Sequence, residues 1–241
     1  MAWFFTDHID GNTHRITGED ARHIAKSLRM DYGEELTLCD RQGVEYRCVI
    51  KGVNPDGVDV DVLENFPCQN EPDVKITLYQ ALPKGDKMDL IVQKAVELGV
   101  HRIVPVLSSR CVSRPDEKSL AKKVQRWQKI AAQAAQQSHR GIIPEVSGAL
   151  SFKKAVTDAQ TAGRSVIFYE CGGRPVRELE WEQDETLAVF IGSEGGFAST
   201  EVQQVLDTGG HAATLGKRIL RAETAPLAAL SVLMYITGNF E

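Results

Sequence analysis

Two loops hold residue types that suit ligand binding and catalysis. The first, Gly192-Ser193-Glu194-Gly195-Gly196-Phe197, follows the apolar run 187–191 and precedes a predicted helix over 200–207. Its three glycines permit positive φ angles and a close approach of the backbone to a ligand. A tight turn without a ligand is the alternative. Neither G-x-G-x-x-G nor G-x-x-x-x-G-K-[ST] is present, so the loop is not typical of a dinucleotide or nucleoside triphosphate site.

The second loop, residues 215–223, follows the last predicted strand and leads into an apolar helix. It contains Lys217, Arg218, Arg221 and Glu223, which is more charge than a connection needs. Ligands of open parallel sheets bind beyond the carboxyl ends of the strands, and both loops lie there. The simpler alternative is that the arginines are solvated or paired with Glu223.

A basic stretch lies in the middle of an otherwise acidic chain. The formal net charge of the 241 residues is −5, which by itself argues against a nucleic-acid partner. Through residue 72 there are 7 Lys and Arg against 14 Asp and Glu, whereas residues 110–140 carry eight basic side chains against Asp116 and Glu117. Such a local excess indicates a surface for an anionic partner, and a solvated helix face explains the charges equally well.

The elements that position these loops fall into two regions. Residues 1–70 alternate short strands with turn signals around one helix over 21–29, as in the strictly alternating Val58-Asp59-Val60-Asp61-Val62. The polar stretch 67–73, with two prolines, is typical of a linker. From residue 74 apolar strands alternate with helices, which predicts a mostly parallel sheet covered on both faces. The strands are predicted over 74–82, 103–107, 165–169, 187–191 and 212–215, and the helices over 88–98, 116–140, 152–161, 200–207 and 226–237.

Composition excludes several protein classes. Hydrophobic residues make up 42% and charged residues 25%, which is ordinary for a globular protein with a real core. No apolar run approaches the roughly 18 residues of a membrane span, and no signal peptide is evident. The five scattered cysteines form no C-x-x-C pair, which favours reduced thiols and a cytoplasmic location. The six histidines lack the spacing of metal ligands, so no metal is expected.

The sequence resembles the 16S rRNA (uracil-3-N)-methyltransferases, S-adenosylmethionine-dependent enzymes of the knotted SPOUT superfamily. Residues 191–197 and 215–225 (LGKRILRAETA) are similar to the two C-terminal motifs of that family. Further similar segments, at 23–30, 84–99, 109–111 and 127–140, extend the resemblance over nearly the whole chain. Two residues depart from the family pattern: Ser193 replaces a common proline, and Trp3 replaces an N-terminal arginine.

The resemblance implies an α/β fold in two domains. Residues 1–70 would form a small PUA-like β-barrel that positions RNA, and residues 73–241 a SPOUT-type methyltransferase domain with a mostly parallel sheet and a deep trefoil knot. It also implies a homodimer that holds S-adenosylmethionine in the knot loops. The implied cofactor-binding residues are Tyr169, Glu170, Gly192, Ser193, Gly195, Gly196, Leu215, Gly216, Ile219 and Leu220.

The implied reaction is methyl transfer to N3 of a uridine in 16S ribosomal RNA or the assembled small subunit. N3 carries a proton at neutral pH, so the enzyme has to remove it and stabilise the anion spread over the flanking oxygens. Arg221 suits the second task, and Glu223 or Glu194 is the expected base or arginine-orienting carboxylate. Phosphate contacts are expected from Arg110, Lys122, Arg126, Lys129, Arg140, Arg22 and Arg29.

Two other functions stay open from the sequence. One is a nucleotide-cofactor enzyme of another class, such as an oxidoreductase. The other is a non-catalytic RNA-binding or assembly factor with the same fold, against which Gly192, Gly195, Gly196 and Arg221 argue.

Overall fold

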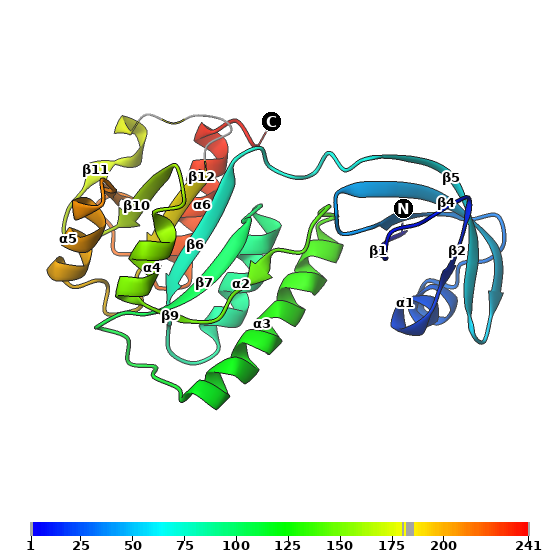
Figure 1. Cartoon of the computed structure of the whole chain (residues 1–241), viewed down its shortest axis with the longest axis horizontal. Helices are drawn as coiled ribbons and strands as arrows, with labels where there is room; N and C mark the ends of the chain where they lie inside the picture. The colour runs from blue at the N-terminus through cyan, green and yellow to red at the C-terminus, as the bar shows by residue number, and fades with distance from the viewer. Residues whose placement is uncertain (1, 180, 182–185, 241) are drawn as a thin grey trace. The chain divides into compact units, whose positions relative to one another are not determined.

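The computed structural model describes residues 2–179, 181 and 186–240. The chain divides into two compact units, which are described separately (Figure 1). The first comprises residues 1–71 and 135–143, and the second residues 72–134 and 144–241. The break after residue 71 lies in the predicted linker, whereas no sequence signal indicates that residues 135–143 group with the first unit.

A five-stranded sheet of order β1-β3-β4-β5-β2 forms the first unit. Its first strand pairs parallel with β3 and its other pairs are antiparallel. The alternation around Val58 behaves as predicted, because Val58 and Val60 are buried while the aspartates between and after them are half-buried. The strands are β1 (Ala2–Phe5), β2 (Thr13–Ile16), β3 (Glu35–Cys39), β4 (Val44–Asn54) and β5 (Gly57–Pro67).

The one helix predicted in this unit differs in winding and bounds. It begins as α1 (Gly18–Arg22) and continues as a π-helix, η1 (His23–Leu28). Ala21 and Ile24 are its buried residues, so it covers the core with a narrow apolar face. Arg29 ends it in the left-handed region at φ 55°.

A parallel sheet forms the second unit, in the order β11-β13-β10-β12-β6-β7-β8, with β9 beside β7. Its central strand β12 (Thr186–Ile191) is buried from Leu187 to Ile191, because helices cover both faces. The predicted apolar strands are confirmed within one or two residues. The others are β6 (Lys75–Ala81), β7 (Arg102–Leu107), β8 (Glu145–Val146), β9 (Leu150–Ser151), β10 (Arg164–Phe168), β11 (Arg174–Pro175) and β13 (His211–Thr214).

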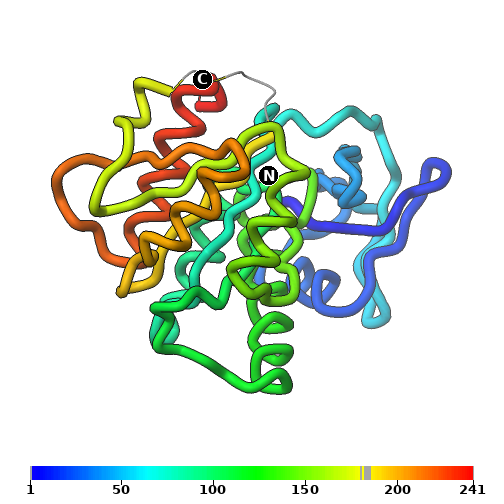
Figure 2. The backbone as a smooth tube through the Cα atoms, turned by 60° about the vertical axis from the view of Figure 1, so that its left-hand side comes forward, coloured from blue at the N-terminus to red at the C-terminus, as the bar shows by residue number. Residues whose placement is uncertain are grey.

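Helices pack on the sheet in pairs. The contacts join α2 (Lys87–Glu97) to α6 (Thr224–Ile236), and α4 (Phe152–Ala159) to α5 (Ser199–Asp207). Figure 1 shows the first pair behind the sheet and the second in front of it, and Figure 2 follows the alternation of strand and helix along the chain. The remaining helices are α3 (Glu117–Gln137) and the short η2 (Val176–Glu178). Of the helices in the described ranges, none is both long and apolar enough to cross a membrane.

Candidate active site

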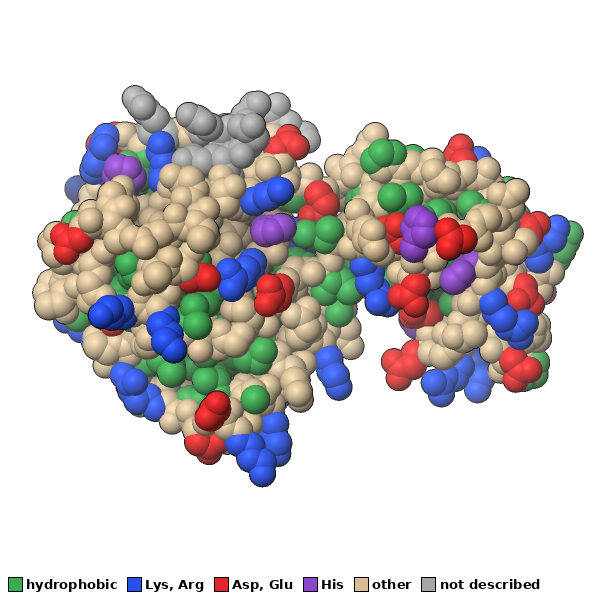
Figure 3. All heavy atoms as spheres, in the orientation of Figure 1, with side chains coloured by type: hydrophobic (Ala, Val, Ile, Leu, Met, Phe, Trp, Pro, Cys, Tyr) green, Lys and Arg blue, Asp and Glu red, His purple; other side chains and the backbone are tan. Residues whose placement is uncertain are grey.

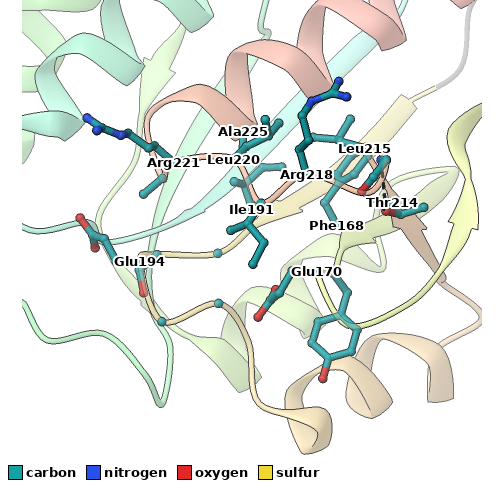
Figure 4. A pocket seen from close by; sticks show the side chains of 18 of the residues that line it. Phe168, Glu170, Ile191, Glu194, Thr214, Leu215, Arg218, Leu220, Arg221 and Ala225 are labelled. Atoms are coloured by element: carbon teal, nitrogen blue, oxygen red, sulfur yellow. Dashed lines mark hydrogen bonds between the residues drawn. The ribbon is translucent and has the colours of Figure 1, made fainter.

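A cavity of about 510 Å³ lies where three neighbouring strands of the parallel sheet end (Figure 4). Strand β10 pairs parallel with both β12 and β13, so the segments that follow all three meet at one edge. Those segments supply most of the cavity wall. All ten predicted cofactor residues line it, and Ser193 and Leu220, from the two loops, share it. The structure therefore brings the two loops together at one site.

The glycine loop forms a tight turn that side chains would block. The Gly196 N–H donates to the carbonyl oxygen of Ser193 at 2.9 Å, and Gly196 has φ +62°. A Cβ at Gly196 would lie 2.1 Å from Oε1 of Glu170, and one at Gly192 would lie 3.0 Å from Cα of Gly196. The positive φ favours glycine at position 196, and a Cβ at Gly192 would press on the backbone of Gly196. The turn they form is also a wall of the cavity.

One polar atom in this turn has no protein partner. Ser193 is 8% exposed, and its Oγ makes no hydrogen bond to any part of the chain that the structure describes. Buried hydroxyls are normally hydrogen-bonded, so an unpartnered Oγ with almost no exposed surface is an unusual feature of this turn. The carbonyl oxygen of Gly192 points toward the buried Gln80, whose Nε2 donates to it at 3.3 Å. Since C=O and N–H of a trans peptide point in opposite directions, the Ser193 N–H is directed away from Gln80.

Arg221 and Glu194 lie at one end of the cavity, which we call the charged end, while Arg218 lies beside Leu215 at the other end. Figure 4 shows Phe168, Leu215 and Thr214 at one end, and Arg221 and Glu194 at the other. Phe168 and Ile191 are buried, whereas Arg221 is exposed. A cavity of this kind suits a ligand with an apolar ring system at one end and a reacting group at the other.

At the charged end, a lysine joins the two predicted carboxylates. The Lys87 ammonium lies 2.8 Å from Glu194 Oε1 and 3.2 Å from Glu223 Oε2. The Lys84 backbone N–H donates to the Glu194 carboxylate at 3.2 Å. Within the described residues no carboxylate pairs with Arg221, although the charge of Arg221 acts on Glu223. Glu223 itself is not part of the cavity wall and connects to it through Lys87.

Both carboxylates are held in the ionised form. Desolvation by burial acts to raise the pKa of Glu194, but the Lys87 ammonium and backbone N–H groups outweigh it and lower this pKa. The pKa of Glu223 is lowered by a backbone hydrogen bond and then by Lys87. The same contacts raise the pKa of Lys87, with the Glu194 hydrogen bond as the largest cause. At neutral pH the group therefore contains two carboxylates and one ammonium ion.

Arg110 contacts the glycine loop. Its Nη1 donates to the carbonyl oxygen of Gly195 at 3.2 Å. A Cβ at Gly195 would lie 3.0 Å from both the Cβ and the carbonyl oxygen of Arg110, so the two backbones pack closely. The structure thus places Arg110 beside the cavity, apart from the basic residues of α3.

The remaining predicted phosphate-binding residues differ in how far their side chains are exposed and in whether they are already ion-paired. Lys122 and Lys129 are exposed on α3, and Figure 3 shows basic side chains over the end of the second unit where α3 begins. Arg126 is also exposed but forms an ion pair with Asp89. In the first unit, Arg22 in α1 and Arg29 after η1 are exposed.

Arg140 is placed differently from the sequence interpretation. Its side chain is 3% exposed, and its Nε and Nη2 donate to the Glu71 carboxylate at 3.1 and 2.5 Å. The Ile142 backbone N–H donates to the same carboxylate at 3.2 Å. A guanidinium buried in this way is not presented to a phosphate. Arg140 instead ties residues 135–143 to the rest of the first unit.

We expect Arg140→Ala to lower the free energy of unfolding by about 3 kcal/mol, because it leaves the Glu71 carboxylate without its partner. Urea unfolding of the full chain measures this loss. The matched variant Arg126→Ala removes a pair whose arginine side chain is 62% exposed, and its cost should be about 0–1 kcal/mol. Equal costs for the two variants would contradict the structural role of Arg140.

Sequence reasoning missed several residues of the site. Lys87 is the most consequential, because it contacts both predicted carboxylates. Its only signal is its place in Lys84-Gly85-Asp86-Lys87-Met88, a segment of the family resemblance to which no role was attached. The other missed wall residues are Phe168, Ile191, Thr214, Arg218, Ala222 and Ala225, and all but Ala225 directly adjoin predicted ones.

Comparisons with known proteins agree with this geometry. An RNA methyltransferase domain model matches residues 70–234, and an RNA methyltransferase PUA domain model matches residues 16–63. Ribosomal RNA small subunit methyltransferase E of Bacillus subtilis is 36% identical, with 93% of this chain and 91% of that protein covered. The Mycobacterium tuberculosis protein of the same name is 31% identical over 99% of this chain and 93% of its own length.

Solved structures extend the similarity to the fold. Ribosomal RNA small subunit methyltransferase E of Neisseria gonorrhoeae, bound to S-adenosylmethionine, has a TM-score of 0.86 at 31% identity, covering 98% of both chains. A Legionella pneumophila methyltransferase in complex with the same cofactor also has a TM-score of 0.86 at 31% identity, covering 98% of this chain and 97% of its own. The predicted fold class, a SPOUT-type α/β domain with an N-terminal PUA-like domain, is confirmed. On the evidence of both domain models and of relatives matched over nearly their full length, this chain belongs to the ribosomal RNA small subunit methyltransferase E family.

Proposed function

We propose that the protein transfers a methyl group from S-adenosylmethionine to N3 of a uridine in 16S ribosomal RNA. One observation carries the proposal: a single cavity joins the glycine turn to a charged end that contains Arg221 and Glu194. Relatives named for small-subunit RNA methylation, two of them solved with S-adenosylmethionine, support the choice of substrate and cofactor.

The residues present fit S-adenosylmethionine. The cavity volume of about 510 Å³ is in the range of small-molecule and cofactor sites. Phe168, Ile191 and Leu220 would contact the adenine, and the backbone of the glycine turn would approach the cofactor closely. The steric requirement for Gly196 keeps this wall free of side chains. When bound, the cofactor supplies an electrophilic methyl group on a positively charged sulfur.

The protein's part in the reaction is to place and ionise the uracil. Its N3 is protonated at neutral pH, and deprotonation spreads negative charge over the two flanking oxygens. Arg221 is free of a carboxylate partner within the described chain, so its planar guanidinium would donate to one of those oxygens. Preorganised donors of this kind stabilise charge that develops in the transition state.

Glu194 and Glu223 are the groups available to receive the N3 proton or to orient Arg221. Their lowered pKa values keep both ionised at neutral pH, as a proton acceptor must be. Glu194 lines the cavity, whereas Glu223 lies behind Lys87. We therefore assign the acceptor role to Glu194 and an orienting role to Glu223.

The RNA would be held by the exposed basic residues. Residues 1–70 position the RNA in this proposal, with Arg22 and Arg29 as contacts, and residues 73–241 carry out the transfer. Lys122, Arg126 and Lys129 on α3 provide the phosphate contacts of the second domain. Arg110 precedes α3 in the sequence and contacts the glycine loop directly.

We expect Lys122→Ala and Lys129→Ala each to weaken RNA binding and to reduce the slope of log affinity against log salt by about one. Filter binding to 16S rRNA over a range of salt concentrations measures this slope. Lys153→Ala, an exposed lysine on α4, is the matched control and should leave the slope unchanged. The same slope in all three variants would mean that the RNA does not bind at α3.

The protein is expected to work as a homodimer in the cytoplasm. Large apolar side chains of the second unit support a dimer, because Ile219 is 86% exposed and Tyr235 on α6 is 73% exposed. Exposed aromatic side chains such as Tyr235 are enriched at protein interfaces. The five cysteines are free thiols, as a reducing compartment requires.

A methyl-transfer assay with the purified chain tests the proposal. Small subunits and protein-free 16S rRNA from cells that lack the modification would be incubated with the protein and S-adenosylmethionine, and the digested RNA analysed by mass spectrometry. We expect 3-methyluridine in at least one substrate. Thermal stabilisation by NAD but not by S-adenosylmethionine would instead support an oxidoreductase.

A further inference from the structure

Lys87 occupies a position at which three separate segments meet. It is the first residue of α2, and its ammonium contacts Glu194 in the loop after β12 and Glu223 at the start of α6. Both glutamates follow Lys87 by more than 100 residues in the sequence. One side chain thus connects the glycine loop to the arginine-containing loop.

The charges around Lys87 explain why this connection matters. Glu194 and Glu223 both approach one ammonium ion, and their side chains are only 28% and 19% exposed. Two carboxylates that share a partly buried site repel each other, and removing the cation between them raises their pKa values. Arg221 is the other cation whose charge acts on Glu223, and the Lys84 backbone N–H is the other donor to Glu194. The neighbouring acid of α2, Asp89, is occupied by Arg126 and Trp127.

We propose that Lys87 is a positioning residue that keeps Glu194 and Glu223 ionised and fixed beside Arg221, so that the group accepting the uracil N3 proton is ready at neutral and mildly acidic pH. This inference rests on the proposed function. Lys87 acts through the two carboxylates, and no contact between Lys87 and the substrate is required.

The test is the pH dependence of methyl transfer by Lys87→Met and Lys87→Gln. Burial remains in both variants and raises the pKa of Glu194 once the ammonium is gone. The ratio of the variant's single-turnover rate to that of the wild type should therefore fall roughly threefold or more when the pH is lowered from about 8 to about 5.5. Because pH affects uracil ionisation equally in the variant and wild-type reactions, this effect cancels in the ratio. Because Lys87→Gln keeps a hydrogen-bond donor, its fall would show that the charge is what matters.

Three controls separate this role from a purely structural one. Lys87→Arg keeps the charge and should give a ratio that does not change with pH. Lys94→Met removes another carboxylate-paired lysine of α2, which bonds Glu97 at 2.8 Å, and should also give a flat ratio. Calorimetric affinity for S-adenosylmethionine should change by less than about threefold in every variant, because Lys87 lies at the charged end of the cavity.

The outcomes are distinguishable. A wild-type protein that transfers no methyl group to any 16S rRNA substrate contradicts the proposed function. An active wild type together with flat ratios for Lys87→Met and Lys87→Gln overturns the role of Lys87 alone. If Lys87→Met does not fold, Lys87→Gln decides the question. If neither variant folds, Lys87→Arg decides it: a ratio of Lys87→Arg to wild-type rate that falls toward acidic pH overturns the proposal.

Discussion

Arg221→Ala should reduce the single-turnover rate of methyl transfer by about 10²–10³-fold while leaving S-adenosylmethionine affinity nearly unchanged. The reason is that Arg221 lies at the charged end of the cavity, has no carboxylate partner within the described chain, and is directed away from Phe168 and Thr214. Its guanidinium is needed when negative charge develops on the uracil oxygens, and the cofactor binds before that. Rapid-quench assays with labelled cofactor measure the rate, and calorimetry measures the affinity.

The matched control for this variant is Lys217→Ala. Lys217 is an exposed cation of the same loop but does not line the cavity. It should keep its rate within about threefold of wild type, as surface substitutions usually do. A comparable loss in both variants would attribute the effect to the charge of the loop, and an undiminished rate in Arg221→Ala would remove Arg221 from the mechanism.

Gly196→Ala should abolish measurable cofactor binding, with a loss of affinity of about 100-fold or more. Its Cβ would lie 2.1 Å from Oε1 of Glu170, so the turn or the glutamate has to move, and both line the cavity. The positive φ of +62° adds backbone strain of about 1 kcal/mol. Calorimetry gives the affinity and thermal unfolding the stability.

Gly209→Ala separates these two effects. Gly209 also has a positive φ, +85°, but a Cβ there would meet no atom within 4 Å. It follows α5 and does not line the cofactor cavity. We expect a similar loss of stability to Gly196→Ala with normal cofactor affinity. Weakened binding in both variants would mean that strain, not the contact with Glu170, controls the site.

Much of the second unit was predictable because its strands are continuous apolar runs between helices. Leu187–Ile191 is buried throughout, as the pattern indicates, and the parallel pairing of β10 with β12 and β13 follows from the alternation. The glycine loop was recognisable because three glycines at a strand end have few purposes other than a close backbone approach. The knot was inferred from the family resemblance alone, because threaded chains are nearly absent from general topology rules.

Contacts between distant segments account for what could not be predicted. Arg140 belongs to a basic stretch, but its partner Glu71 is 69 positions away, so the pattern of charge along the chain could not reveal that it is buried. Lys87 is unremarkable as the first residue of a helix until α6 brings Glu223 beside it. The predicted helix over 21–29 contains a π-helix from His23, since local helix patterns do not distinguish this winding from an α-helix.

The most direct test of the central claim is mass spectrometry of 16S rRNA from cells that lack this protein. One 3-methyluridine should disappear, the wild-type gene should restore it, and genes encoding Arg221→Ala or Gly196→Ala should not. A complete set of 3-methyluridines in the 16S rRNA of the deleted strain would contradict the central claim.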